Sequence, residues 1–94
     1  MLYPFITFAD GMEVVYSEIK ERNGQEYVTV KFERWNDERD DFDSMECDLP
    51  NGKMKNIIGF SKSEADYHNE CMIKLQDMIF ECSKENMEGK ICRR

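Results

Sequence analysis

The sequence predicts an α+β fold in which a four-stranded antiparallel β-meander packs against one long C-terminal α-helix. Three observations predict it. Apolar and polar residues alternate through the middle third of the chain, which is typical of strands with one buried face. The dipeptides Asp10-Gly11 and Asn23-Gly24 separate apolar runs and are typical of tight hairpin turns. Apolar residues then recur at helical spacing towards the end of the chain.

The 94 residues suffice for a single domain over residues 1–94. Pro4 lacks an N–H group, so the first strand should lie at a sheet edge or begin there. In the third strand, Val28, Val30 and Phe32 should face the core, because they alternate with polar residues. The expected strands cover residues 3–8, 12–21, 26–34 and 42–49.

Residues 53–60 are compatible either with a fifth short strand or with an ordered approach to the helix. Ser61, followed three residues later by Glu64, forms a capping box, which predicts a helix over residues 62–86. One apolar stripe of this helix should face the sheet. The stripe consists of His68, Cys71, Met72, Leu75, Met78, Ile79 and Cys82. Gly89 is typical of a helix end, and we expect residues 90–94 to be a flexible tail.

The balance of charge restricts the classes of partner. The net charge is −7, and binding to phosphates requires clustered lysines and arginines. We therefore expect no direct nucleic-acid partner and no membrane partner. A protein partner with a basic surface fits better, since opposite potentials steer association. The alternative is that the charge only keeps a small domain soluble.

The first residues contain no basic segment and no apolar run of signal-peptide length, and no stretch is apolar enough to span a membrane. The expected location is the cytoplasm. In a reducing compartment the four cysteines should be thiols. They are Cys47, Cys71, Cys82 and Cys92.

An acid-rich segment lies between residues 37 and 48, and its only basic residue is Arg39. The acids are Asp37, Glu38, Asp40, Asp41, Asp43, Glu46 and Asp48. The segment has three interpretations: a partner-binding strip that mimics spaced phosphates, a divalent-cation site, or a solvated loop followed by an edge strand protected by charge. The spacing of the acids does not fit an EF-hand loop.

Two aromatic residues belong to this candidate strip. Phe42 and Trp35 are candidate anchors for a protein partner, because buried aromatic side chains dominate binding energy at interfaces. Another interpretation is that Trp35 caps the end of the core, with its N–H group near a loop carbonyl. Stacking on nucleic-acid bases is disfavoured by the neighbouring acids.

A second apolar line lies off the main helix stripe. Ile73, Phe80 and Met87 are spaced by seven residues, and their line is more than 90° from the Leu75 stripe. One helix face cannot bury both against a sheet. The line predicts a homodimer or partner surface, unless the sheet curls around the helix or residues 53–60 and the tail cover it.

No catalytic constellation is visible, so we expect no catalytic residues, no metal and no cofactor. His68 and Cys71 lie one helical turn apart, but two ligands do not make a zinc site, and no third group is evident to orient the histidine. Both residues are better explained as core or half-buried positions.

Three stretches carry a resemblance: residues 8–14 (FADGMEV), 27–34 (YVTVKFER) and 42–50 (FDSMECDLP). Together with IIGFS at residues 57–61 and the following helix, they resemble short uncharacterised acidic proteins carried by phages and mobile elements of Firmicutes. The resemblance implies a mobile-element setting, in which small acidic proteins include anti-CRISPR inhibitors that block a basic nucleic-acid groove, antitoxins and host-takeover factors. It carries over no activity and no site residue.

The sequence therefore predicts a non-enzymatic inhibitor or adaptor that binds a basic surface of a nucleic-acid-binding protein. The alternative is a homodimeric structural protein, or an antitoxin, that assembles through the helix. A small metal or thiol enzyme ranks last, because no site geometry supports it.

Overall fold

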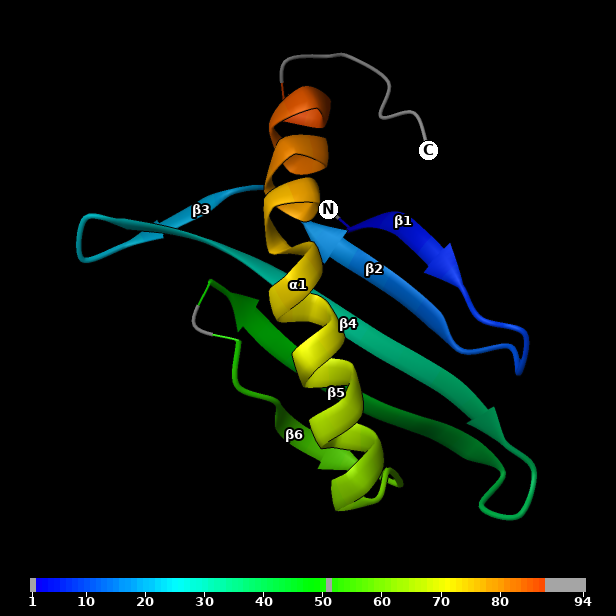
Figure 1. The fold of residues 1–94 in the computed structure, drawn as a ribbon. Helices are drawn as coiled ribbons and strands as arrows, with labels where there is room; N and C mark the ends of the chain where they lie inside the picture. The colour runs from blue at the N-terminus through cyan, green and yellow to red at the C-terminus, as the bar shows by residue number, and fades with distance from the viewer. Residues whose placement is uncertain (1, 51, 88–94) are drawn as a thin grey trace.

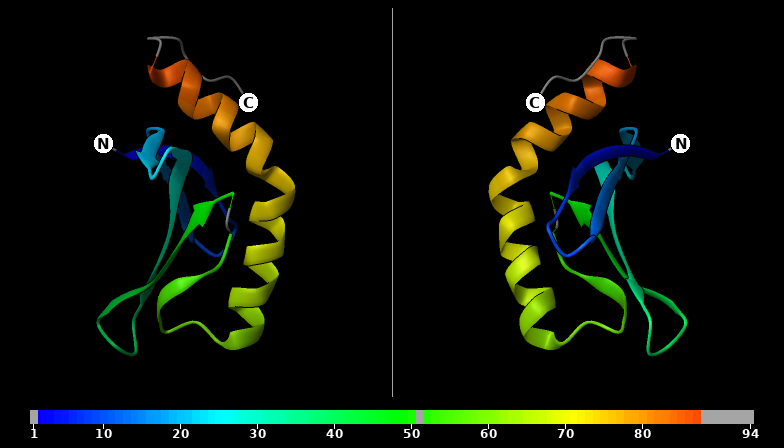
Figure 2. Two further views of the ribbon diagram at one scale, coloured as in Figure 1. Left: turned by 90° about the vertical axis from the view of Figure 1, so that its left-hand side faces the viewer. Right: turned by 90° about the vertical axis from the view of Figure 1, so that its right-hand side faces the viewer.

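The computed structural model describes residues 2–50 and 52–87 of the chain, and one helix crosses one face of an antiparallel sheet in it (Figure 1). The elements are β1 (Leu2–Thr7), β2 (Glu13–Ser17), β3 (Lys20–Arg22), β4 (Gln25–Asn36), β5 (Asp41–Leu49), β6 (Lys55–Ile58) and α1 (Lys62–Met87). The strand order is β1-β2-β4-β5-β6, and β3 also pairs with β4. Side views place α1 on one face of the sheet and no other described element on the opposite face (Figure 2).

The α+β prediction is confirmed, but the described sheet has six strands rather than four. One reason is that the strand expected over residues 12–21 is broken into β2 and β3, whose registers against β4 differ by one residue. Ser17 lies at the break, and its hydroxyl accepts a hydrogen bond of 3.0 Å from the backbone N–H of Thr29. The Ser17 carbonyl accepts one of 2.8 Å from the Ser83 hydroxyl on α1. These side-chain bonds stabilise an irregularity that alternation alone does not predict.

The other extra strand is β6, which pairs with β5 and settles the choice left open for residues 53–60. Because β5 lies between β4 and β6, it is not an edge strand. The interpretation of the acid-rich segment as a charge-protected edge is therefore wrong. The strand that contains Pro4 does lie at an edge of the sheet, as predicted.

The Asn23-Gly24 turn and the capping box of the helix have the geometry that the sequence predicts. Asn23 and Gly24 have positive φ angles of 54° and 79°, as a tight hairpin requires. Helix α1 begins after a capping box, as predicted: the N–H of Glu64 donates to the Ser61 hydroxyl at 3.1 Å, and the N–H of Ser61 donates back to the Glu64 carboxylate at 2.9 Å.

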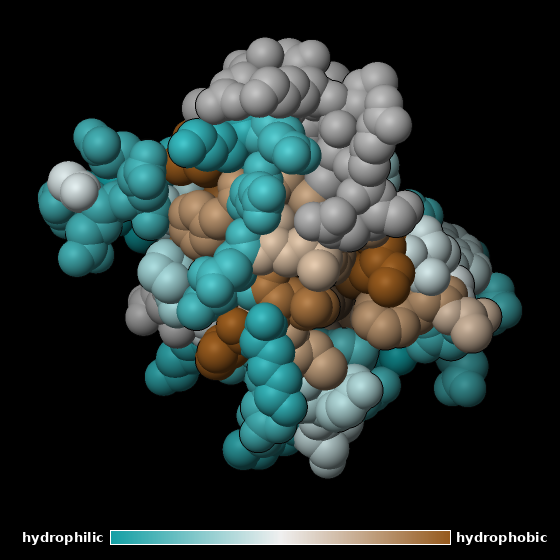
Figure 3. All heavy atoms as spheres, turned by 45° about the horizontal axis from the view of Figure 1, so that its top comes forward, coloured by the Kyte–Doolittle hydropathy of each residue, from teal (hydrophilic) through white to brown (hydrophobic). Residues whose placement is uncertain are grey.

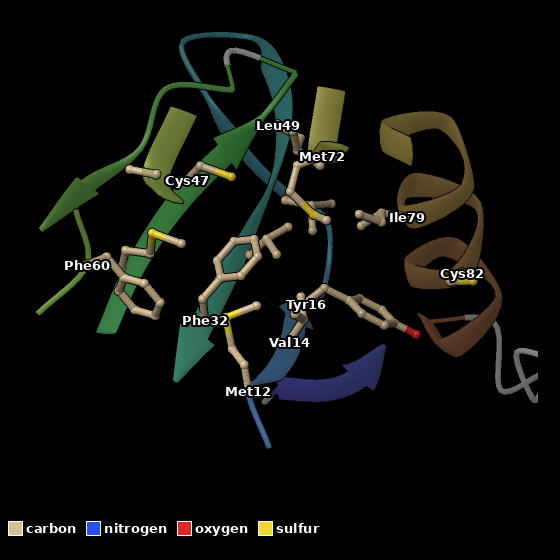
Figure 4. Close-up of a cluster of buried hydrophobic side chains, with 14 residues drawn as sticks. Met12, Val14, Tyr16, Phe32, Cys47, Leu49, Phe60, Met72, Ile79 and Cys82 are labelled. Carbon is tan, nitrogen blue, oxygen red and sulfur yellow. The ribbon is translucent and has the colours of Figure 1, made fainter. Parts of the chain in front are cut away.

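The core lies between α1 and the face of the sheet that it covers (Figure 4). The predicted inward residues of β4, Val28, Val30 and Phe32, are all buried, as are Met72, Ile79 and Cys82 on the helix. The rest of the predicted helix stripe is half-buried. The buried apolar cluster consists of Met12, Val14, Tyr16, Val28, Val30, Phe32, Met45, Cys47, Leu49, Phe60, Ala65, Met72, Ile79 and Cys82.

Cys47 and Cys71 are free, as expected, whereas Cys82 is disulfide-bonded, so the expectation of a thiol is wrong for Cys82. The expected helix stop at Gly89, the tail over residues 90–94 and Cys92 lie outside the described residues. Within the described part of the chain, no helix has the length and apolar character to cross a membrane.

Candidate protein-binding surface

The end of the β4–β5 hairpin carries an exposed aromatic pair. Trp35 and Phe42 are direct partners in the β4–β5 register, and alternation places both on the face of the sheet opposite α1. Their ring centroids are 5.2 Å apart, and the rings meet edge to face at 82°. Each residue is 49% exposed. Large aromatic side chains on an outer face are available to a partner.

The indole of Trp35 is fixed by the loop that follows it. Its N–H donates to the carboxylate of Asp37 at 2.7 Å. The interpretation of Trp35 as a cap on the core is therefore wrong, because the ring lies on the outer face and its N–H meets a carboxylate rather than a loop carbonyl. The hydrogen bond occupies the edge of the indole, and the residue as a whole stays half-exposed.

The loop between the two strands is ordered by its own side chains. The side-chain carbonyl of Asn36 accepts hydrogen bonds from the backbone N–H groups of Glu38 and Arg39, at 3.0 and 3.3 Å. Asp40 has a φ of 53°, a conformation that aspartate tolerates in turns. The hairpin end points away from α1 in the side views (Figure 2). Four of the predicted acids are exposed there: Asp37, Glu38, Asp40 and Asp41.

Asp43 belonged to the predicted partner-binding strip, but it is only 1% exposed and points to the helix side of the sheet. Its carboxylate accepts hydrogen bonds from Arg34 at 2.9 Å, from Asn36 at 3.1 Å and from Arg39 at 2.5 Å. These bonds, with that from Arg34 the strongest influence, lower the pKa of Asp43 although burial acts in the opposite direction. Asp43 therefore holds the hairpin together and cannot contact a partner.

The same cluster joins the hairpin to the start of the helix. Arg34 donates to Glu64 at 3.0 Å, and its guanidinium lies 4.3 Å from the centre of the Phe60 ring. The hydrogen bond from the Ser61 N–H, followed by that from Arg34, lowers the pKa of Glu64. A Cβ atom at Gly59 would overlap the Asp43 carboxylate, so this close approach requires glycine.

The carboxylates at the far end of the predicted strip already have partners within the fold. Glu46 accepts a hydrogen bond from Asn56 at 3.0 Å. Asp48 accepts one from Thr29 at 2.7 Å and pairs with Lys55 at 3.0 Å. Burial raises the pKa of Asp48, but the bonds from Thr29 and Lys55 outweigh it and lower the pKa overall. The structure thus separates the seven acids into four exposed acids at the tip, one buried carboxylate (Asp43), one carboxylate hydrogen-bonded to an amide (Glu46) and one ion-paired carboxylate (Asp48).

Two carboxylates of the outer face were missed. Glu13 and Glu33 are direct partners in the β2–β4 register, and both are exposed. Neither forms an ion pair among the residues that the structure describes. Glu33 lies two residues before Trp35 on the same face. Alternation along β4 is enough to place Glu33 outward. Its pairing with Glu13 depends on the β2–β4 register, which local sequence patterns do not reveal.

The apolar helix line is not a continuous exposed surface. Ile73 is 42% exposed and packs closely against Gly52, whereas Phe80 is half-buried against the core. The side chain of Met87 lies outside the described part of the structure. Charged residues occupy the outer side of α1, and hydrophilic side chains form a stripe with hydrophobic ones on either side in Figure 3.

The one histidine is enclosed by aromatic residues. His68 and Cys71 are half-buried, as expected. Three rings contact the imidazole: Phe8, Phe32 and Tyr67, at centroid distances of 5.5, 5.6 and 5.1 Å. Burial is the main cause that lowers the pKa of His68 and raises that of the Cys47 thiol to about 12. Among the described residues, no three His, Cys, Asp or Glu side chains are grouped to hold a metal ion.

No protein-family model matches the chain, and comparisons with curated proteins and with solved structures found no match. The fold and the site define the chain as an acidic α+β protein with an exposed aromatic pair at a carboxylate-rich hairpin tip. The resemblance to phage and mobile-element proteins stays a prediction.

Proposed function

We propose that the protein is a non-enzymatic binding module, an acidic inhibitor or adaptor that occupies a basic surface of a nucleic-acid-binding protein. The observation that carries the proposal is the aromatic pair Trp35–Phe42, held half-exposed at an acidic hairpin tip. An anti-CRISPR-like inhibitor of a nucleic-acid-guided nuclease is its most specific form.

Rigidity supports a binding role for the tip. Asp43 on β5 receives bonds from two residues of β4 and from the loop, and Arg34 ties the hairpin to the helix N-terminus. A surface that is ordered before it meets its partner loses less conformational entropy on binding. The tip is therefore suited to recognition of a fixed partner surface.

Electrostatics support a basic partner. The chain carries a net charge of −7, and the exposed tip acids have few cations near them. Carboxylates at such a tip present negative charge to a partner protein, in the groove where that partner ordinarily binds nucleic-acid phosphates. Complementary charge of this kind raises association rates and specificity more than it raises affinity.

The test measures binding to a panel of purified basic nucleic-acid-binding proteins, with a DNA oligonucleotide as competitor. We expect at least one panel member to bind, the oligonucleotide to compete, and the affinity to fall when salt rises to ~0.5 M. Reversal of charge at Glu33 and Glu38 should slow association. These two are suitable because neither side chain makes a hydrogen bond or ion pair within the described structure, whereas reversal at Asp43 would break the hairpin.

A control with the same change in net charge is Asp77→Lys with Glu81→Lys on the outer side of α1, where both residues are exposed. The proposal predicts that this control associates faster than the tip variant. Equal association rates for the two variants, or binding that is indifferent to salt, would contradict it.

A further inference from the structure

We propose that Trp35 and Phe42, flanked by Asp37 and Glu33, form a docking site for an arginine side chain of a protein partner. The inference rests on the proposed function and names the chemistry that the tip recognises. It is drawn from how this protein places its own arginines.

Two internal arginines use one arrangement. The guanidinium of Arg22 lies 4.5 Å from the centre of the Tyr27 ring and 4.0 Å from the carboxylate of Asp48. The guanidinium of Arg34 lies over the Phe60 ring and pairs with Asp43 and Glu64 at 2.9 and 3.0 Å. In each case an aromatic face and at least one carboxylate surround the guanidinium. Both interactions favour a planar cation.

The outer face of the hairpin tip presents the same groups with no guanidinium of the described residues over the rings, because the guanidinium of Arg39 in the loop is bound to Asp43 and to the Phe42 carbonyl. Phe42 and Trp35 offer aromatic surface, Asp37 holds its carboxylate at the edge of the indole, and Glu33 follows on the same face. No cation lies over either ring among the residues that the structure describes. Glu33 also faces Glu13 directly, and two like charges opposite each other in a sheet repel. A partner cation would relieve this repulsion.

The rings and carboxylates of the tip favour one kind of partner side chain over the others. A purely apolar partner would cover the carboxylates without giving them hydrogen bonds, which costs free energy. Lysine satisfies the charge, but its compact and strongly hydrated ammonium cannot stack on a ring and form two parallel bonds to a carboxylate at the same time. Arginine can do both. An arginine of a basic protein surface is therefore the occupant that fits the ring pair and the carboxylates together.

The test compares a short peptide of alternating arginine and glycine with its counterpart in which lysine replaces every arginine. Trp35 is the only tryptophan in the chain, so its fluorescence reports on the site directly. We expect the arginine peptide to bind about two- to fivefold more tightly, the factor given by an exposed cation–π contact, and to change Trp35 fluorescence. The variants Trp35→Leu and Phe42→Leu should remove this preference when affinity is measured by calorimetry.

Tyr67→Leu is the matched control, because Tyr67 is an aromatic residue on α1 that is 62% exposed. It should keep the arginine preference. Equal, salt-sensitive binding of both peptides would overturn arginine recognition and leave the acidic binding surface standing. An arginine preference that survives both tip substitutions, or an unchanged Trp35 signal, would also overturn it. If neither peptide bound and the basic panel also failed to bind, the proposed function would fail as well.

Discussion

At the scale of single residues, position within the strand decides what an acid does. Asp43 is surrounded in sequence by exposed acids, yet it is buried and binds Arg34, Asn36 and Arg39. Alternation placed Asp43 on the side of Met45 and Cys47, so its inward direction was predictable. The arginines that compensate its charge were not, because they come from another strand and from the loop. Counting acids along the chain therefore placed Asp43 in the partner-binding strip, although its carboxylate is buried and bonded within the fold.

The close contact between Gly59 and Asp43 gives a prediction at this scale. Gly59 and Gly24 have similar φ angles, 81° and 79°, but a Cβ at Gly24 meets no atom within 4 Å, whereas one at Gly59 overlaps the Asp43 carboxylate. Gly24→Ala should lower the free energy of unfolding by about 1–2 kcal/mol for the left-handed backbone alone. Gly59→Ala should cost at least about 1 kcal/mol more, because the carboxylate must move. Urea denaturation measures both, and equal losses would show that the contact contributes nothing.

At the scale of elements, short sequence motifs predicted those features that depend only on neighbouring residues. The hairpin dipeptides, the capping box and the edge strand with Pro4 were all predicted. The break at Ser17 was not, because it depends on bonds to Thr29 and to the helix residue Ser83, which are distant in sequence. The local pattern at β6 is ambiguous for a similar reason, since its four residues are all exposed and show no alternation of burial.

The helix cap provides a prediction at the element scale. Ser61→Ala removes the hydroxyl that accepts the Glu64 N–H, and we expect the free energy of unfolding to fall by about 1 kcal/mol. For a domain of this size such a loss lowers the midpoint of thermal unfolding by about 4–8 °C. Ser63→Ala is the control, since Ser63 is exposed in the first turn and makes no capping bond in the described structure. Circular dichroism during heating would reveal whether the two variants differ.

At the scale of the whole molecule, the ion pairs that fix the tip also tie its stability to pH. The pKa values of Asp43, Asp48 and Glu64 are lowered in the folded state. A carboxyl group with a lowered pKa stabilises the fold fully when the pH is above the ordinary pKa of the group, near 4. This stabilisation is lost as the pH falls through the lowered pKa. Acid should therefore loosen the hairpin tip and the whole fold together, since the same carboxylates connect them.

A separate loss of stability should begin at a higher pH. Burial among aromatic rings lowers the pKa of His68 below 6.5, although Glu64 and Asp10 act in the opposite direction. Below pH 6.5 the unfolded chain then binds a proton that the folded chain does not, so acidification favours unfolding. His68 is the only histidine in the chain. We expect the unfolding midpoint to fall between pH 7 and 5, and His68→Phe to flatten this interval while the steeper fall below pH 4 remains. Calorimetry between pH 7 and 3 measures the unfolding midpoint in both intervals. A His68→Phe profile parallel to that of the wild type would show that the enclosed imidazole does not cause the fall between pH 7 and 5.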